Sequence, residues 1–298
     1  MTGPQSNTHP GRNRRDLVPP MSFITLITDF GLTDGYVGAM KGVILSIAPQ
    51  AAIVDISHAV PVQDLRSAAW ILYTAYHTFP EGTIHCVIVD PGVGSQQRAI
   101  AIQAGAYTFV APDNGLLSYV LVQEPLHMAV ELTNPRFHRH PVSHTFHGRD
   151  IFAPAAAHAA RGVSLAELGA PIDQLVTWPL PRPEHLSEGS LVGHILHIDH
   201  FGNCITDLRL RSEEDALILT NLPCERAEPL LIPRRQVRLK VGGMALSGIS
   251  HTYADGPPGE PLALVGSSSH LEIALGGGSA AQALGLRVGD PIIVYLKT

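Results

Sequence analysis

Cysteine is scarce in this chain of 298 residues, which contains only Cys86, Cys204 and Cys224. Their odd number and unrelated spacings favour neither a disulfide framework nor a zinc knuckle, and they fit a cytoplasmic protein in a reducing compartment. No apolar run approaches the roughly 18 residues that a membrane helix requires, so no membrane partner is expected. The N-terminus has no hydrophobic stretch after its charges, which argues against a signal peptide.

Charged residues are also few, at 15% of the chain, whereas hydrophobic residues make up 45%. This composition indicates a compact globular protein with a sizeable core. The net charge of −6 argues against nucleic acid as a partner, because nucleic-acid-binding surfaces are basic. Residues 1–20 are rich in Pro, Gly, Asn and Arg, and we expect them to form a disordered leader.

The first half of the chain alternates apolar strand patterns with helical ones. Strands are expected at residues 23–28, 52–56, 87–89, 100–102 and 108–110. Helices are expected at residues 36–47, 64–78, 116–122 and 151–161, where apolar residues recur at helical spacing. This alternation predicts an α/β domain over residues 21–181, with a mostly parallel central sheet covered by helices.

Three prolines in the stretch from Trp178 to Pro183 mark the expected domain boundary. Beyond it the pattern changes to short strands separated by glycine turns. Strands are expected at residues 189–198, 236–241, 262–265, 271–274 and 291–296, with one helix near 279–284. The pattern predicts a smaller all-β, barrel-like domain over residues 189–298.

Three carboxylates, those of Asp29, Asp90 and Asp199, stand at turn positions directly after apolar strand patterns. Each alone is typical of a turn, where Asp bonds its own backbone. The carboxyl ends of strands are, however, where open α/β sheets bind ligands, and a carboxylate can accept hydrogen bonds from two ribose hydroxyls. Three such residues in one chain therefore indicate a polar ligand site.

Sixteen histidines raise the question of a metal, and His138, His140, His144 and His147 crowd one segment. The sequence contains neither an HExxH motif nor a matched Cys/His pair, and a proline-rich loop is a poor scaffold for metal ligands. We therefore expect no metal, although a metallohydrolase built on this cluster is one alternative. His147 differs from its neighbours because it directly precedes Gly148 and an expected helix.

Six collinear motifs between Phe23 and Leu296 resemble those of the S-adenosyl-L-methionine (SAM) hydroxide adenosyltransferases, hydrolases related to the SAM-dependent fluorinase and chlorinase. The motifs are ITDFGLTDGYVGAMKG (27–42), VDPGVG (89–94), APDNGLL (111–117), TFHGRDIFAP (145–154), IDHFGNCITDL (198–208) and SSSHLEIALGGGSA (267–280). The resemblance implies an N-terminal α/β domain, a C-terminal β-barrel-like domain and a homotrimer that binds SAM between neighbouring subunits. It also implies the reaction of SAM with water to give adenosine and L-methionine, without metal or organic cofactor.

The resemblance further implies roles for individual residues. The catalytic set of the family falls on Asp90, Arg98 and His147, and Arg98 would keep Asp90 ionised and fix its direction. Asp29 is similar to the ribose-binding carboxylate of the family. The remaining substrate contacts would come from Asp34 and Asp199 at the methionine end, and from Phe201, Asn203, Ser267, Glu272 and Leu275 around the adenine.

This chain departs from its relatives at several positions. Relatives often carry arginine at both the seventh and the eighth position after the aspartate, whereas here Gln97 precedes Arg98. Halogenases have an aromatic residue in place of Asp90 and lack His147, which favours water over halide as the nucleophile. A halogenase relative has arginine where this chain has Ser268. The alternatives are a SAM-dependent halogenase and a non-catalytic protein that binds SAM or adenosine.

Overall fold

The computed structural model describes residues 22–186, 190–213, 216–220 and 230–295. The expected leader at residues 1–20 and Cys224 lie outside this range. Contacts between Cα atoms divide the chain into two compact units. The first comprises the chain up to Gln63, Thr78–Asp113 and Pro125–Asp173; the second comprises Asp64–His77, Asn114–Glu124 and the chain from Gln174 onward. The boundaries 21–181 and 189–298 stay a prediction.

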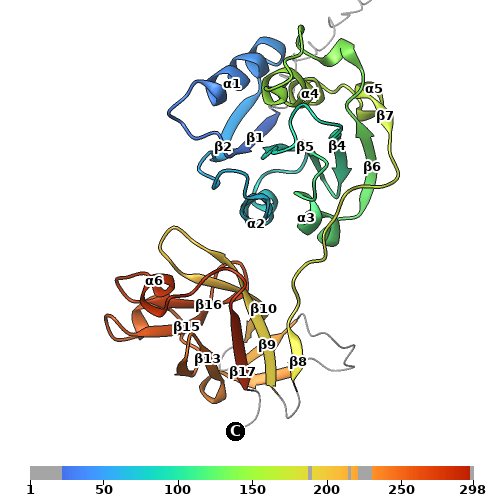
Figure 1. Ribbon diagram of the computed structural model, residues 1–298. Helices are drawn as coiled ribbons and strands as arrows, with labels where there is room; N and C mark the ends of the chain where they lie inside the picture. The colour runs from blue at the N-terminus through green and yellow to red at the C-terminus, as the bar shows by residue number, and fades with distance from the viewer. Residues whose placement is uncertain (1–21, 187–189, 214–215, 221–229, 296–298) are drawn as a thin grey trace, which may run out of the picture. The chain divides into compact units, whose positions relative to one another are not determined.

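The first unit is built on a seven-stranded sheet (Figure 1). Its order is β2 (Ala52–Ser57), β1 (Phe23–Thr28), β3 (Ile84–Ile88), β5 (Tyr107–Pro112), β4 (Ala99–Ala104), β6 (Leu126–Glu131) and β7 (Ala170–Pro171). Strands β2, β1, β3 and β5 pair in parallel, β4 runs antiparallel to β5 and β6, and β7 is antiparallel to β6. The sheet is therefore mixed, with five of its strands pointing the same way, as the alternating pattern predicts.

Helices α1 (Tyr36–Ile47) and α4 (Ala153–Ala160) contact each other and lie along one face of this sheet (Figure 1). A π-helical turn, Gly148–Phe152, leads into α4, and the short α5 (Leu165–Leu168) follows it. Helix α4 is rich in alanine, and small side chains allow its backbone to approach the sheet closely. The core between these layers includes Leu26, Met40, Ile44, Cys86 and Phe152.

The second unit contains an antiparallel assembly of strands together with α2 (Leu65–Ala75), α3 (Ser118–Gln123) and α6 (Ala280–Leu284). The main path runs β12 (Leu230–Pro233), β11 (Ala216–Leu219), β10 (Cys204–Glu213), β9 (Ser190–Ile198), β17 (Pro291–Tyr295), β13 (Arg238–Val241) and β14 (Met244–Ser247). Strand β16 (His270–Leu275) pairs with β10 and with β15 (Pro261–Val265), and β8 (Glu184–Leu186) pairs with β9. The antiparallel β architecture is confirmed; closure into a barrel stays a prediction.

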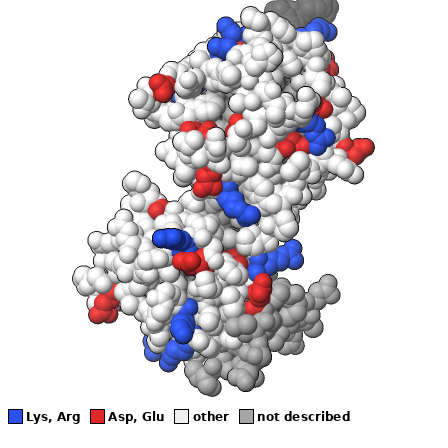
Figure 2. Space-filling model, viewed as in Figure 1, with Lys and Arg blue, Asp and Glu red and all other residues white. Residues whose placement is uncertain are grey.

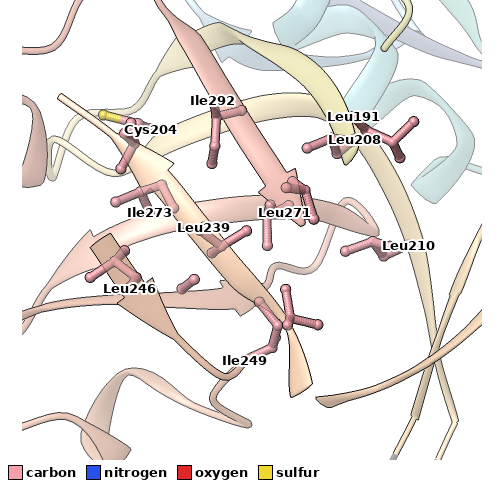
Figure 3. Packing of buried hydrophobic residues seen from close by; sticks show 14 of the residues in the cluster. Leu191, Cys204, Leu208, Leu210, Leu239, Leu246, Ile249, Leu271, Ile273 and Ile292 are labelled. Atoms are coloured by element: carbon pink, nitrogen blue, oxygen red, sulfur yellow. The ribbon is translucent and has the colours of Figure 1, made fainter. Parts of the chain in front are cut away.

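Leucine and isoleucine side chains from these strands form a core of their own. Figure 3 shows Leu191, Leu208, Leu239, Leu271 and Ile292 gathered in one cluster, and all are at most 2% exposed. They come from β9, β10, β13, β16 and β17, which are distant in sequence. Their burial fixes the register of the strands, since a shift by one residue would turn each of them to the opposite face.

Candidate functional site

The first unit contains a cavity of about 370 Å³ that brings Asp90 and His147 together. Aromatic rings from three segments form part of its lining, with the rings of Phe30, Tyr36 and Phe146 centred 5.2–6.0 Å from one another. The two polar side chains therefore face a partly apolar cavity. Such a cavity suits a ligand with an apolar body and a few polar groups.

Asp90 follows β3 at the edge where the parallel strands end. The backbone N–H of Gly92 and the Gln97 carboxamide both donate hydrogen bonds to its carboxylate. Burial raises the pKa of Asp90, and the nearby Asp29 raises it further, whereas His147 and the two hydrogen bonds oppose the shift. A carboxylate with a raised pKa is a better proton acceptor than an ordinary one.

His147 stands directly before the π-helical turn, in a segment that Asp150 holds in place. The buried Asp150 carboxylate accepts from Arg149 Nε at 2.7 Å, Arg149 Nη2 at 2.8 Å, Ser143 N at 2.9 Å and Arg139 Nη1 at 3.2 Å. Burial opposes ionisation of Asp150, yet these hydrogen bonds outweigh it and lower its pKa to about 2. A carboxylate that is ionised at neutral pH therefore holds the chain on both sides of His147.

Asp29 follows β1 and lies close enough to Asp90 for its charge to act on that residue. Its Oδ2 accepts a hydrogen bond from the backbone N of Gln63 at 2.9 Å. The preceding Thr28 is bonded to the buried His58 at 2.8 Å, and the carbonyl of His58 accepts from Gly31 N at 2.8 Å. Asp34 lies exposed in the loop that leads to α1.

Arg98 directs its guanidinium to Asp113, at the end of β5. Its Nε donates to Asp113 Oδ2 at 2.9 Å and its Nη2 donates to the same oxygen. The preceding residue, Gln97, is the one that donates to Asp90. Successive side chains in extended backbone point to opposite sides, so neighbours entering β4 face different partners. The sequence marks Gln97 only as a departure from relatives and does not indicate its bond to Asp90, because the register at this strand start is not readable from one sequence.

In the second unit, Asp199 organises the turn between β9 and β10. Its Oδ1 accepts from the backbone N of Phe201 at 2.9 Å and of Asn203 at 2.8 Å, and its Oδ2 accepts from the Asn203 side-chain amide at 2.9 Å. The carboxylate thus binds its own turn, as the residue type favours. The turn leaves the Phe201 ring 74% exposed.

Glu272 lies on β16 next to this turn, since Ile205 of β10 pairs with it. Tyr253 Oη donates to its carboxylate at 2.8 Å. Burial raises the pKa of Glu272, and the Asp199 charge raises it further. Ser267 lies in the turn between β15 and β16, and Leu275 ends β16. The Asp199 turn therefore lies by the end of β16 that carries Leu275, whereas Ser267 lies in the turn at the start of that strand.

Two histidines of the cluster form hydrogen bonds with backbone carbonyl groups of their own segment. His138 Nε2 lies 3.0 Å from the Leu132 carbonyl, and His140 Nε2 lies 2.7 Å from the Pro135 carbonyl. Within the described ranges, no group of three or more His, Cys, Asp or Glu side chains is placed to hold a metal ion. None of the helices in those ranges is both long and apolar enough to span a membrane.

Comparisons with known proteins cover nearly the whole chain. The model of the SAM hydroxide adenosyltransferase N-terminal domain matches residues 24–169, and that of the C-terminal domain matches residues 193–293. An "(R)-S-adenosyl-L-methionine hydrolase" of Thermus thermophilus is 39% identical over 278 residues, covering 90% of this chain and 98% of the relative. A "Fluorinase" of Actinoplanes sp. is 29% identical, covering 91% of this chain and 96% of the relative. A solved structure of an uncharacterized conserved protein from Thermotoga maritima has a TM-score of 0.78 at 32% identity, covering 91% of this chain and 99% of that one.

Proposed function

The chain belongs to the SAM hydroxide adenosyltransferase family, and from this premise we propose that it is a hydrolase that converts SAM and water into adenosine and L-methionine. The observation that carries the proposal is the placement of Asp90 and His147 on one partly apolar cavity. Water attacks the ribose C5′ in line with the sulfonium. The new C5′–O bond replaces the C5′–S bond, and the bonding electron pair leaves with sulfur as the neutral thioether of methionine.

The sulfonium departs without help from an acid, so the protein has to supply an aligned nucleophile and a proton acceptor. Asp90 accepts the proton that the attacking water loses, and His147 lies on the same cavity to share or pass on that proton. Asp29 binds the ribose hydroxyls, since its remaining lone pairs can accept from two adjacent hydroxyls. The reaction is a nucleophilic substitution and includes no redox step.

The family motifs assign the remaining substrate contacts. Phe201 packs on the adenine, Asn203, Ser267, Glu272 and Leu275 contact it, and Asp34 and Asp199 hold the methionine end. Arg98 belongs to the catalytic set by its match to the family motif, and its guanidinium is bonded to Asp113. These assignments rest on the motifs that the chain shares with its family.

The active assembly is a homotrimer with the substrate bound between subunits. In support, large apolar side chains are exposed in both units: Leu32 is 74% exposed, Val62 79% and Phe201 74%. Over the face shown in Figure 2, charged side chains are scattered among uncharged ones. The scarcity of cysteine favours a cytoplasmic location.

The decisive test is incubation of the purified protein with SAM in ¹⁸O-labelled water, followed by mass spectrometry. We expect equal amounts of adenosine and methionine, with ¹⁸O in the 5′-hydroxyl of adenosine and none in methionine. Label in another product, or no product at all, contradicts the proposal.

Three alternatives have their own signatures in the same assay. A halogenase yields 5′-halo-5′-deoxyadenosine when chloride or fluoride is added. A binding protein retains adenosine or SAM through gel filtration without turnover. A metallohydrolase loses activity on treatment with a chelator.

A further inference from the structure

The loop from Asp90 to Arg98 folds back so that Gln97 covers the Asp90 carboxylate. The Val93 backbone N donates to the Asp90 carbonyl at 3.2 Å and the Ser95 N to the Gly92 carbonyl at 3.0 Å, which makes consecutive tight turns. The Ser95 hydroxyl then accepts from the Gln97 backbone N at 3.1 Å. The Gln97 carboxamide completes the ring by donating to Asp90 Oδ1.

Two glycines make this closed loop possible. A Cβ on Gly92 would lie 2.7 Å from Gln97 Oε1 and 2.9 Å from Gln97 Cδ, so the carboxamide occupies space that only glycine leaves open. Gly94 has a φ of +78°, and a Cβ there would lie 2.4 Å from the His144 carbonyl oxygen. The loop that holds Gln97 therefore also rests against the segment that leads to His147.

We propose that Gln97 is the positioning residue that orients the Asp90 carboxylate toward the attacking water. This proposal rests on the hydrolase function proposed above. It implies that the group that orients Asp90 is a neutral carboxamide. Arg98 is occupied by Asp113 on the other side of the strand start. A neutral donor fixes the direction of the carboxylate without adding a positive charge to it, whereas a guanidinium would do both.

The consequence is a specific dependence of turnover on pH. Asp90 has to be ionised to accept a proton, so kcat falls as the pH falls through the Asp90 pKa. Among the described residues, the charged or titratable groups that act on Asp90 or share its cavity include His147, Asp29 and Arg149. None of these residues is altered when residue 97 is replaced, so movement of the acid limb reports on a charge placed beside Asp90, and the loss of kcat in Gln97→Ala reports on the contact itself.

The test compares pH profiles of kcat for the wild type, Gln97→Arg, Gln97→Glu and Gln97→Ala, measured as adenosine release. Gln97→Arg adds a cation and lowers the Asp90 pKa, so we expect the acid limb to move to lower pH by about one unit. Gln97→Glu adds an anion and moves it to higher pH. Gln97→Ala removes the donor, and we expect kcat to fall about 10- to 100-fold with KM within about twofold of wild type. Gln97→Arg regains most of that loss because it restores a donor.

Gln96 supplies the matched control, since it is exposed and directly precedes Gln97 in the same loop. Gln96→Arg adds the same charge one residue away and should leave the acid limb within about 0.2 units of the wild type. Thermal unfolding checks that each variant is folded. Coincident profiles for Gln97→Arg and Gln96→Arg, or wild-type kcat in Gln97→Ala, overturn the role of Gln97. A wild type that releases no adenosine overturns the proposed function instead, before any variant is compared.

Discussion

The carboxylate of Asp90 is the group whose removal should affect the chemistry most directly. Asp90→Asn keeps the size of the side chain and its contact with Gln97 but cannot accept the proton of water. We expect kcat to fall by about 10²- to 10⁴-fold, the range typical of a lost general base, with little change in KM for SAM. Steady-state adenosine release measures both constants.

A carboxylate outside the cavity gives the control for that substitution. Asp173 is exposed, so Asp173→Asn should retain wild-type kcat. His147→Ala should resemble Asp90→Asn in direction, since its side chain lines the same cavity. Wild-type turnover in Asp90→Asn would remove this residue from the mechanism.

Asp150 offers a prediction about stability rather than chemistry. Its pKa is lowered from 3.8 to about 2, because the hydrogen bonds from Arg149, Ser143 and Arg139 outweigh the effect of burial. A folded-state pKa below the unfolded value stabilises the fold above pH 3.8 and loses that effect as the pH falls through 2. Asp150→Asn should therefore lower the free energy of unfolding by roughly 2 kcal/mol at pH 7.

The pH dependence separates this effect from simple repacking. Urea unfolding measures the free energy of unfolding of Asp150→Asn and of the wild type at pH 7 and at pH 3. The difference between the two proteins should be about half as large at pH 3 as at pH 7. A difference that stays constant with pH would mean that the ionised state of Asp150 contributes nothing. The exposed Asp173 again provides the reference substitution.

At this scale the sequence predicts the type of the functional residues better than their partners. Asp29, Asp90 and Asp199 could be singled out because each follows an apolar strand pattern. Which side chain meets Asp90 depends on how the loop after it folds back, and that path is determined by contacts such as the one between Gly94 and His144. The motif therefore indicated Arg98, whereas the geometry brings Gln97 to the carboxylate.

At the scale of an element, the loop between β3 and β4 should be sensitive to substitution at its second glycine. Gly94→Ala places a side chain in the left-handed region and against the His144 carbonyl, so the loop has to move. Because Gln97 and Asp90 belong to this loop, we expect kcat to fall about tenfold or more, together with a loss of stability. Adenosine release and thermal unfolding measure the two effects.

Substitution of Gly162 is the control that distinguishes the effect of backbone strain from that of moving the loop. It has a φ of +84° after α4, but no atom lies within 4 Å of an added Cβ. Gly162→Ala should cost about 1–2 kcal/mol of stability and leave kcat unchanged. Equal losses of kcat in both variants would show that the loop position is irrelevant to turnover.

Helices and strands differ in how well their own sequence patterns predict them. Strand β1 and helix α1 lie where the apolar periodicity predicts them, because their burial follows directly from that period. Strand β10 was not predicted, since it carries Asp207 in its interior. That carboxylate is buried and accepts a hydrogen bond from the His194 backbone N at 2.8 Å. His194 lies on β9, and the residues around Asp207 do not indicate this partner. The sequence pattern does not predict strand β6, because half of it is exposed at Leu126–Met128 and its pairing with β4 forms only in the folded sheet.

At the scale of the whole molecule, the prediction concerns assembly. Light scattering after gel filtration should give three times the 31.9 kDa of the chain. Phe201→Asp places a charge on an apolar side chain that is 74% exposed in the single chain. If that ring is buried by substrate and a neighbouring copy, the substitution should raise KM for SAM and weaken the trimer. A monomeric wild type with full activity would contradict the proposed assembly.

A site shared between subunits makes a quantitative prediction that a site within one chain does not. Asp90→Asn removes a residue of the first unit, and Asn203→Ala removes one of the second. In a cyclic trimer each site would take its first-unit residues from one copy and its second-unit residues from the next. We expect each variant alone to release little adenosine, because each lacks one residue of the proposed site. When the two variants are denatured, mixed in equal amounts and refolded, random assembly leaves about one quarter of the sites with both residues intact. We therefore expect about 25% of wild-type adenosine release from the mixture.

A site formed within one chain would leave the mixture as inactive as its parents, because every chain carries one defect. Refolded wild type shows how much activity the procedure itself preserves.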